Sequence, residues 1–362
     1  MANFLESDIG EIIYEVGDVA QDFAGRTVLL AGGRGFLGRY LTSVFDELNR
    51  SVLRSPCTVI VVDDLITSGD AGMMFPDGPH RRFIQHDVIQ PLEFEGAVDY
   101  VVHAAGIASP SYYRAYALET LDVAVSGTRN LLEMAKRDGA RFTFFSSSEI
   151  YGDPDPANIP TPETYRGNVS TQGQRACYDE GKRVGETLSY IFHHYFDLHT
   201  NVIRPFNVYG PGMQEHDYRV LPNFASRIKG GRPLSVYGSG QQTRTFCYIT
   251  DALNGFLRVI ARGRSGETYN IGTSSPEITM RDLVERIGAV LGRRPDLRLV
   301  DYPETYPGDE PMRRCPDISK ARSQLGYVPR VDLAEGLARF LGWADENYLG
   351  VDDEVLIPAR RR

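Results

Sequence analysis

Val28-Leu29-Leu30-Ala31-Gly32-Gly33-Arg34-Gly35-Phe36-Leu37-Gly38 is the stretch that decides how this sequence folds. An apolar run typical of a buried strand passes directly into glycines spaced three apart, and a helical pattern follows. Glycine lets the backbone turn tightly and approach a pyrophosphate, which the free N–H groups of a helix N-terminus stabilise. Any tight strand-to-helix turn can use glycines, so the stretch by itself allows a dinucleotide site without requiring one.

The end of the next apolar run strengthens the dinucleotide interpretation. Val59-Ile60-Val61-Val62 reads as a second strand, and Asp63 follows it. A carboxylate at this place accepts hydrogen bonds from the ribose hydroxyls of NAD, and its charge repels the additional phosphate of NADP. Arg34, inside the glycine turn, could instead pair with that phosphate. We give Asp63 the greater weight, expect Arg34 to point to solvent, and predict NAD as the cofactor.

The rest of the chain has the pattern of a parallel sheet. Short apolar runs alternate with longer amphipathic ones, which is typical of strands joined by crossover helices. The expected strands are Thr27–Leu30, Thr58–Val62, Arg82–Gln85, Tyr100–His103 and Phe142–Ser146. After Arg204 the alternation gives way to segments rich in Gly and Pro. We therefore predict an α/β protein with a Rossmann-type doubly wound parallel sheet and a smaller, mixed C-terminal substrate-binding lobe.

These patterns divide the chain into three parts. Residues 1–24 are predicted to form an N-terminal amphipathic helix with Ser7 as its N-cap. This helix is expected to pack on the main body or on a partner subunit. Residues 25–206, with a return segment near 245–262, are the predicted NAD-binding domain, and residues 207–350 are mainly the substrate lobe.

The composition argues against several classes of protein. A formal charge of −9, from 48 acidic and 39 basic residues, provides no basic field to attract nucleic acid. The sequence lacks both an apolar run of roughly 20 residues and a secretory signal pattern, so we expect a soluble, cytoplasmic protein without membrane contact. The four scattered cysteines are interpreted as free thiols. His193 and His194 are adjacent and diverge on a helix, so no metal site is predicted.

The candidate catalytic residues centre on one helix. Tyr178 and Lys182 stand four apart in the expected helix Ala176–Phe196, so both side chains emerge on one face. An ammonium near a phenol favours the phenolate, which lowers the pKa of the tyrosine toward the range of a general base. The run after the fifth expected strand adds the polar residues Ser147, Ser148 and Glu149. A Tyr–Lys pair is common on helices, and it becomes a catalytic candidate here through its combination with the serines and the glycine turn.

Together these elements resemble the extended short-chain dehydrogenase/reductase family, the NAD-dependent epimerases and dehydratases, from Arg26 to Trp343. Within that family the sequence is most similar to UDP-glucuronate decarboxylases, the UDP-xylose synthases. The motifs that carry the likeness are Ser148–Pro154, Arg175–Arg183, Arg204–Pro211, Tyr237–Arg244 and Arg314–Ile318. The likeness implies NAD as the cofactor, a nucleotide sugar as the substrate, and a homodimer formed through the helices that carry the Tyr–Lys pair.

The resemblance also assigns roles to individual residues. Tyr178 and Lys182 are the implied catalytic pair, Ser148 would hydrogen-bond the sugar C4 oxygen, and Glu149 would position the sugar or handle the C5 proton. The implied NAD contacts are Gly32, Gly35, Phe36, Leu37, Gly38, Asp63, Asp87, Val88, Ala104, Ala105, Gly106, Tyr178 and Lys182. The implied substrate contacts are Asn207, Arg219, Val220, Tyr237 and Arg244 for the nucleotide and diphosphate, and Arg314 for the sugar and its carboxylate.

The implied reaction is oxidation at C4, loss of carbon dioxide from glucuronate, and re-reduction to UDP-xylose. Three departures from the usual pattern leave the substrate open: Gly106–Ser111 replaces a doubled Ser-Pro, Val123-Ala124 replaces Thr-Asn, and Ser147 replaces a threonine. A 4-epimerase, a 4,6-dehydratase or a 4-dehydrogenase of the same family therefore remains an alternative. The dehydratase is disfavoured because Ser148-Glu149 stands where an Asp-Glu pair is usual. A non-catalytic NAD-binding regulator is a remote alternative, which the retained catalytic set argues against.

Overall fold

The strands of the main sheet are buried on both faces. In β1 (Thr27–Ala31), β2 (Thr58–Asp63) and β4 (Tyr100–His103) almost every residue is buried, which is typical of parallel strands covered by helices on both sides. The other strands of this sheet are β3 (Arg81–Gln85), β5 (Arg141–Phe145), β6 (Thr200–Pro205) and β11 (Glu267–Ile271). The computed structural model describes residues 5–68, 77–217, 219–302 and 311–351. It confirms the predicted Rossmann-type sheet, in which all seven strands are parallel.

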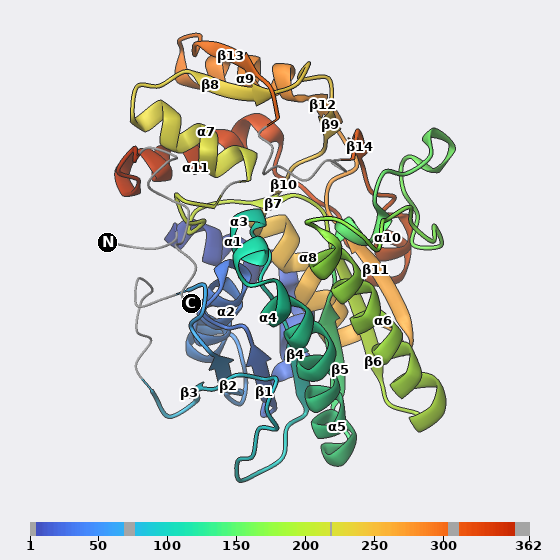
Figure 1. The fold of residues 1–362 in the computed structure, drawn as a ribbon. Coiled ribbons are helices and arrows are strands. Elements are labelled where there is room, and N and C mark those ends of the chain that lie inside the picture. Colours follow the sequence, from blue (N-terminus) through green and yellow to red (C-terminus); the bar gives the residue numbers. More distant parts are fainter. Residues whose placement is uncertain (1–4, 69–76, 218, 303–310, 352–362) are drawn as a thin grey trace.

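The strand order creates a crevice at one edge of the sheet. The order is β11-β6-β5-β4-β1-β2-β3, so the chain first builds outward from β1 to β3 and then places β4 on the other side of β1. In such sheets ligands bind outside the carboxyl ends of the strands, where the order reverses. The residues that follow β1, β4, β5 and β6 are therefore delivered to one place (Figure 1).

The predicted strands match the observed ones to within one residue. Tyr100–His103 is observed as predicted, whereas the predicted Phe142–Ser146 is observed as Arg141–Phe145. The register explains this shift, because Arg141 lies opposite Tyr100 in the neighbouring strand. Two strands of this sheet, β6 and β11, were not predicted. Both are short runs, and β11 pairs with β6, which lies far away in the sequence.

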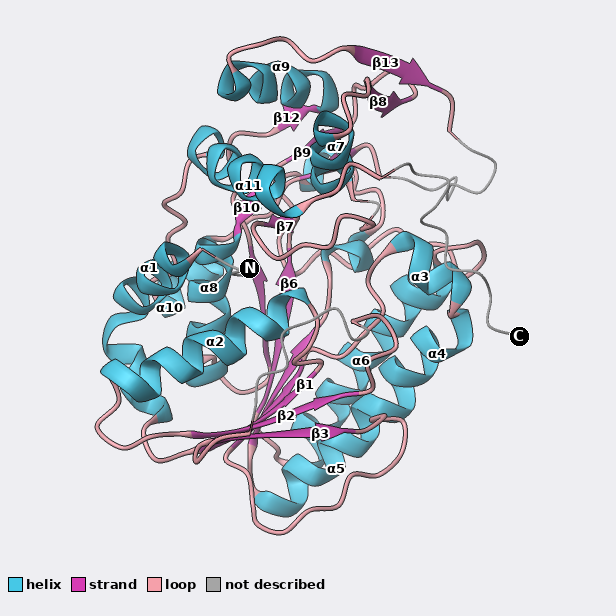
Figure 2. Ribbon diagram, turned by 90° about the vertical axis from the view of Figure 1, so that its left-hand side faces the viewer, coloured by secondary structure: helices cyan, strands magenta, loops and turns pink. Residues whose placement is uncertain are grey.

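Helices cover both faces of the sheet (Figures 1 and 2). One face carries α2 (Phe36–Ser51) and α8 (Ile249–Arg262), and the other carries α4 (Ala117–Asp122), η2 (Val123–Gly127), α5 (Thr128–Asp138) and α6 (Ala176–Phe196). The predicted helix Ala176–Phe196 is confirmed. It packs closely on β5, because a Cβ at Gly185 would lie 2.2 Å from the ring of Phe144. Within the described part of the chain, we find no helix with both the length and the apolar character needed to cross a membrane.

The N-terminal helix packs on the main body. α1 (Glu6–Val16) contacts α2 and α8, and the 3-10 helix η1 (Gly17–Phe23) follows it. The prediction of Ser7 as the N-cap is wrong, because Leu5 precedes the helix and Ser7 lies in its first turn. The acidic residues of that turn, Glu6 and Asp8, instead interact favourably with the helix dipole.

Asp8 of α1 is a buried carboxylate that contacts side chains from three other places in the fold. Asp8 is fully buried and accepts hydrogen bonds from the hydroxyls of Tyr40 in α2, at 3.2 Å, and of Tyr248 before α8, at 3.0 Å. Arg339 of α11 (Leu333–Asn347) approaches the same carboxylate at 3.5 Å. Burial raises the pKa of Asp8 from 3.8 to about 6, since its hydrogen bonds and Arg339 offset only part of the desolvation.

A second lobe lies over the carboxyl edge of the sheet (Figures 1 and 2). Its helices are α7 (Val220–Lys229), α9 (Met280–Leu291) and α11. Its strands are β8 (Leu234–Tyr237) with β13 (Leu297–Val300), and β9 (Thr243–Arg244) between β12 (Ile278–Thr279) and β14 (Arg313–Arg314). β7 (Val208–Tyr209) pairs with β10 (Cys247–Tyr248), and the short helices are α3 (Pro110–Ala115), η3 (Ser148–Tyr151), η4 (Pro156–Asn158) and α10 (Ser319–Leu325). The limits proposed for the three parts of the chain stay a prediction.

We expect Asp8→Asn to change the pH dependence of stability. The pKa of Asp8 is higher in the folded protein than its usual 3.8, so the stabilisation from its bound proton is lost as the pH rises through about 6. An amide does not titrate. The difference in unfolding free energy between the variant and the wild type should therefore move by about 1 kcal/mol in favour of the variant between about pH 5 and pH 7. Urea denaturation at the two pH values measures this shift, and a difference independent of pH would contradict it.

Candidate active site

Two glycines of the first turn are in close contact with their surroundings. Gly32 has a φ of 84°, in the left-handed region that favours glycine, and a Cβ there would lie 2.4 Å from the backbone nitrogen of Ala105. A Cβ at Gly38 would lie 2.2 Å from the carbonyl oxygen of Gly32. These glycines therefore let α2 pack directly on the turn and let the end of β1 pack against the segment that follows β4.

Asp63, at the end of β2, forms hydrogen bonds with the backbone of this turn and of the loop after β2. Its carboxylate accepts hydrogen bonds from the backbone N–H groups of Arg34, at 2.8 Å, and Leu65, at 2.9 Å. The expectation that Arg34 points to solvent is wrong, because its side chain is buried and its guanidinium lies 4.1 Å from the centre of the Phe83 ring. Arg34 packs over β3 because the aromatic face offers a favourable partner for a cation.

A small cavity of about 90 Å³ lies at the ends of β1, β2 and β4. Its lining includes the predicted cofactor residues Gly32, Gly35, Asp63, Asp87, Val88, Ala104, Ala105 and Gly106. Ala104 and Gly106 also line a larger cavity, so the two meet where β4 ends. Small residues around a narrow space, with the acceptor Asp63 at one end, fit a flat ligand that carries ribose hydroxyls. The residues present therefore fit NAD.

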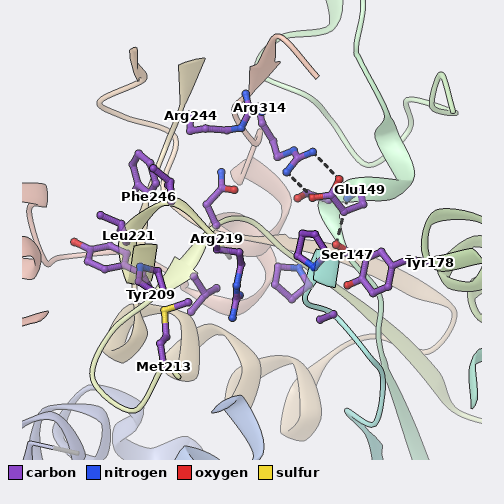
Figure 3. Close-up of a pocket in the computed structure, with 18 of the residues that line it drawn as sticks. Ser147, Glu149, Tyr178, Tyr209, Met213, Arg219, Leu221, Arg244, Phe246 and Arg314 are labelled. Carbon is purple, nitrogen blue, oxygen red and sulfur yellow. Dashed lines mark hydrogen bonds and ion pairs between the residues drawn. The ribbon is translucent and has the colours of Figure 1, made fainter. Parts of the chain in front are cut away.

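The larger cavity, of about 730 Å³, lies between the sheet edge and the second lobe (Figure 3). The predicted residues that line it are Leu37, Ser147, Ser148, Glu149, Tyr178, Lys182, Asn207, Arg219, Val220, Tyr237, Arg244 and Arg314. Residues from both lobes, far apart in the sequence, thus face one space. We call this space the main cavity.

Tyr178 lies in the first turn of α6 with its ring almost fully buried. The ring stacks on that of Tyr113 in α3, with centroids 5.4 Å apart and planes inclined by 18°. In Figure 3 the Tyr178 hydroxyl points toward Ser147, and this serine partly offsets the rise that burial causes in the pKa of Tyr178. The Ser147 hydroxyl also accepts the backbone N–H of Glu149 at 3.3 Å, as the cap of η3. The end of β5 and the start of α6 thus hold a phenol against a hydroxyl.

Lys182 lies one turn further along α6. Its ammonium donates to the carbonyl oxygen of Phe145 at 2.7 Å, and its nitrogen is 5.7 Å from the centre of the Tyr178 ring. Burial lowers the pKa of Lys182 to about 8 and raises the pKa of Tyr178. The predicted lowering of the Tyr178 pKa is therefore wrong for the chain by itself, because removal from water disfavours the charged forms of both groups.

Glu149 is the acidic centre of an arginine cluster. Its carboxylate makes a bidentate ion pair with Arg314, with distances of 2.5 and 2.7 Å (Figure 3). It makes a further ion pair with Arg175. Arg175 also approaches the carboxylate of Asp179 at 3.3 Å. Burial raises the pKa of Asp179, which weakens its ability to neutralise the arginines. Two guanidiniums at this end of the main cavity thus share one lining carboxylate.

Two more arginines face the main cavity from the second lobe. Arg244 in β9 lies beside Arg314 in β14, because these strands are parallel and place the two residues opposite each other. Arg219 precedes α7, and its Nε lies 2.9 Å from both carboxylate oxygens of Asp217. Figure 3 places Arg219 between Tyr178 on one side and Tyr209 on the other.

Asn207 and Tyr237 complete the second-lobe lining. Asn207 has a positive φ of 43°, and its side-chain amide donates to the carbonyl oxygen of Thr245 at 2.8 Å. Tyr237 stacks on Tyr302, with ring centroids 5.4 Å apart. Both side chains are therefore held by neighbours in the same lobe while they face the cavity.

Among the lining residues that the sequence analysis missed are one aromatic and two cationic side chains beside the catalytic helix: Tyr113, Arg114 and Arg175. Arg175 stands three residues before Tyr178, so the helical spacing of that motif was a signal for it. Tyr113 and Arg114 lie in α3, a short helix without a distinctive pattern. With them, the cations that line the main cavity in the described part of the chain are Arg114, Arg175, Lys182, Arg219, Arg244 and Arg314, and the carboxylate that lines it there is that of Glu149. Such a lining favours a ligand with several negative charges.

Two predicted cofactor contacts, Phe36 and Gly38, line neither of these cavities. Gly38 packs on the turn, and Phe36 makes an edge contact with Tyr40, so their contact with the cofactor stays a prediction.

All four cysteines are free thiols, as predicted. Among the described residues no group of three His, Cys, Asp or Glu side chains could hold a metal ion.

Comparisons with known proteins agree with this geometry. The model of the NAD dependent epimerase/dehydratase family matches residues 28–272, which extend from β1 to just past β11. UDP-glucuronic acid decarboxylase 3 of Arabidopsis thaliana is 40% identical over 312 residues, which are 86% of this chain and 86% of that protein.

Solved structures are also similar. DesIV, a dTDP-glucose 4,6-dehydratase from Streptomyces venezuelae with NAD bound, is 27% identical with a TM-score of 0.73, and the match covers 89% of this chain and 97% of that one. MoeE5 in complex with UDP-glucuronic acid and NAD is 25% identical with a TM-score of 0.71, over 88% and 99% of the two chains. The family model ends at residue 272, whereas the structural matches cover 88–89% of the chain and so include the second lobe as well as the sheet.

We expect Gly38→Ala to weaken NAD binding by about tenfold or more, because the added Cβ would collide with the backbone of the glycine turn. Calorimetric titration with NAD measures the change. Gly10→Ala is the matched control, since a Cβ there would meet nothing within 4 Å. It should bind NAD normally and gain up to about 1 kcal/mol of stability from better helix propensity. Equal NAD affinity of Gly38→Ala and the wild type would remove the glycine turn from cofactor binding.

Proposed function

Because the chain belongs to the NAD dependent epimerase/dehydratase family, we propose that it is a UDP-glucuronate decarboxylase that forms UDP-xylose. The observation that carries the proposal is the pair Arg175 and Arg314, which share Glu149 at the catalytic end of the main cavity. A planar guanidinium pairs bidentately with a carboxylate, so this pair suits a sugar acid.

The remaining charges of the main cavity suit the other half of the substrate. Arg219 and Arg244 face the cavity from the second lobe, where we place the diphosphate. A volume of about 730 Å³ is in the range of sites that enclose a small organic ligand. UDP-glucuronate carries two phosphates and a carboxylate, so its charges complement a lining with more cations than anions.

NAD is held, in this proposal, by the glycine turn, by Asp63 and by the small residues that follow β4. When bound, it supplies a hydride acceptor at the sugar C4 and later the same hydride as a donor. A Cβ at Gly106 would lie 3.1 Å from Nζ of Lys182, so a glycine here keeps the space beside that ammonium open. We place the reacting end of the cofactor in this space.

Tyr178 is the proposed base that takes the proton of the C4 hydroxyl. Its hydroxyl points toward Ser147, and both serines line the main cavity, so we assign contact with the C4 oxygen to Ser147 together with Ser148. Burial raises the pKa of Tyr178, and positive charge from Lys182 and from an oxidised nicotinamide would favour the phenolate again. The proton returns from Tyr178 to the C4 oxygen when the sugar is reduced.

Loss of carbon dioxide follows from the chemistry of the oxidised sugar. A ketone at C4 is β to the C5 carboxylate, so carbon dioxide leaves with its bonding electrons delocalised into the ketone. Arg175 and Arg314 hold and orient the carboxylate, and Glu149 positions the sugar or returns a proton to C5. Orientation by fixed groups supplies much of the rate enhancement in such reactions.

We expect the purified protein, incubated with UDP-glucuronate and NAD, to form a product that is lighter by about 44 mass units, the mass of carbon dioxide. Mass spectrometry of the nucleotide sugars measures the change. A product of unchanged mass would instead identify a 4-epimerase. A product lighter by about 2 mass units would identify a 4-dehydrogenase, which passes two hydrogens to NAD.

Tyr178→Phe is the control for this assay. It removes the proton acceptor but keeps the ring that stacks on Tyr113, so NAD binding should persist while turnover falls by roughly a hundredfold or more. Turnover close to that of the wild type would remove Tyr178 from the role of base.

We further propose that the protein is a homodimer assembled through α4 and α6. These helices pack side by side on one face of the sheet, and each presents exposed apolar side chains. Leu118 in α4 is 74% exposed and Tyr190 in α6 is 57% exposed. Burial of such side chains is a driving force for association.

We expect the double variant Leu118→Glu/Tyr190→Glu to be a monomer near the chain mass of 40.4 kDa, and the wild type to have twice that mass. Light scattering coupled to size-exclusion chromatography measures both. Tyr14→Glu, at a site in α1 that is 81% exposed, is the control and should leave the mass of the wild type unchanged. A monomeric wild type would refute the proposed interface.

The four cysteines give an indication of the cellular compartment in which the protein works. Cys57, Cys247 and Cys315 are buried and Cys177 is partly buried, all without a disulfide. Reduced cysteines are typical of proteins kept in a reducing compartment. We therefore propose a cytoplasmic location.

A further inference from the structure

The loop that joins β7 to α7 is held from outside by residues 348–351, near the C-terminal end of the chain. Glu215 lies on this loop, and its carboxylate accepts the backbone N–H groups of Leu349 at 2.8 Å, Gly350 at 2.7 Å and Val351 at 3.0 Å. The hydroxyl of Ser226 in α7 donates to the same carboxylate at 2.7 Å. One carboxylate thus ties three consecutive backbone N–H groups and a helix to the loop. We call this arrangement the Glu215 clasp.

Two neighbouring hydrogen bonds reinforce the clasp. The hydroxyl of Tyr348 donates to the carbonyl oxygen of Met213 at 2.9 Å, and Arg232 donates to the carbonyl oxygen of Val351 at 2.6 Å. Tyr348 is itself buried against the aromatic residues of α11. The clasp is therefore anchored to the body of the second lobe.

The inner face of the same loop lines the main cavity. Met213 lies two residues before Glu215 and lines the cavity, as does Arg219, four residues after it. Asp217 pairs with Arg219, and its backbone N–H donates to the carbonyl oxygen of Gln214 at 3.0 Å. A shift of Glu215 would therefore move both cavity residues.

The opposite side of the loop contacts the cofactor-binding lobe. Arg39 of α2 donates to the carbonyl oxygen of Gly212 at 2.5 Å, and the side-chain amide of Gln214 reaches the carbonyl oxygen of Thr67 at 3.4 Å. Thr67 lines the small cavity that fits NAD. The loop therefore lies between the two lobes, and the clasp fixes it from the second-lobe side.

We propose that Glu215 is a positioning residue for substrate binding, which places Arg219 in the main cavity by clasping residues 349–351. Glu215 lines neither cavity and acts through the loop. This inference rests on the proposed function, in which Arg219 binds the diphosphate of the nucleotide sugar.

The second lobe should remain folded without the clasp. Its core is formed by buried apolar residues such as Leu221, Phe224, Leu337 and Phe340 in α7 and α11, whereas Leu349 in the clasp is 83% exposed. The expected consequence of losing the clasp is therefore a misplaced arginine in a folded protein.

Two variants open the clasp from opposite sides. Glu215→Gln replaces the carboxylate by a neutral amide with a single acceptor oxygen, and a chain ending at Tyr348 removes the three N–H donors. Both variants should bind UDP about tenfold more weakly than the wild type, as measured by calorimetry, while NAD affinity changes less than about twofold. The KM for UDP-glucuronate should rise by a similar factor while kcat stays within about twofold. Glu285→Gln, an exposed change of the same charge in α9, is the matched control and should leave every value unchanged.

The combination of Glu215→Gln with the shortened chain adds a sharper test. The two changes break one arrangement, so the double variant should bind UDP no more weakly than either single variant. UDP affinity equal to that of the wild type in both single variants would overturn the clasp, and so would additive losses. A fall in kcat with unchanged KM, or an equal loss of NAD binding, would also overturn it by indicating a general structural effect. A wild type that binds NAD but no UDP would instead refute the proposed function.

Discussion

A parallel sheet that is buried on both faces exposes the carboxyl ends of its strands at a single edge, and the chemistry of this protein depends on that constraint. The helices that cover the two faces leave ligands nowhere else to reach the strand ends. Gly32 after β1, Gly106 after β4 and Ser147 after β5 therefore meet at one edge. Close packing makes the arrangement rigid, since Gly32 and Gly38 leave no room for a side chain where the turn meets its neighbours.

The second lobe supplies positively charged side chains at this edge, whereas the sheet supplies the backbone turns. It brings Arg219, Arg244 and Arg314 to the main cavity, and Arg244 and Arg314 are neighbours only because β9 and β14 pair in parallel. A buried cation is costly unless it is paired, and Glu149 partly meets that need for Arg314, while Asp217 pairs with the half-exposed Arg219. An acidic ligand can take over the same pairing. The cavity is thus organised for anions before any ligand arrives.

Burial also sets the resting state of the catalytic pair. It disfavours both the phenolate of Tyr178 and the ammonium of Lys182, so the two groups are closer to their neutral forms than exposed side chains would be. The positive charge of an oxidised nicotinamide can then shift the balance toward the phenolate. In the proposed enzyme the phenolate is therefore favoured chiefly when oxidised NAD is bound.

By itself the sequence determined the local features of this protein. The first five strands of the main sheet to within one residue, the helix of Tyr178 and Lys182, and the glycine turn with Asp63 all follow from side-chain periodicity and backbone freedom over short stretches. Only the tertiary structure decided the pairing of β11, the Glu149 cluster with Arg175, the place of Arg34 and the direction of the Tyr178 pKa shift. Each of these depends on residues far apart in the sequence, or on burial, which exists only once the chain is packed. A pattern of residues can specify which groups are present, but the sign of an electrostatic effect depends on how much water the fold leaves around them.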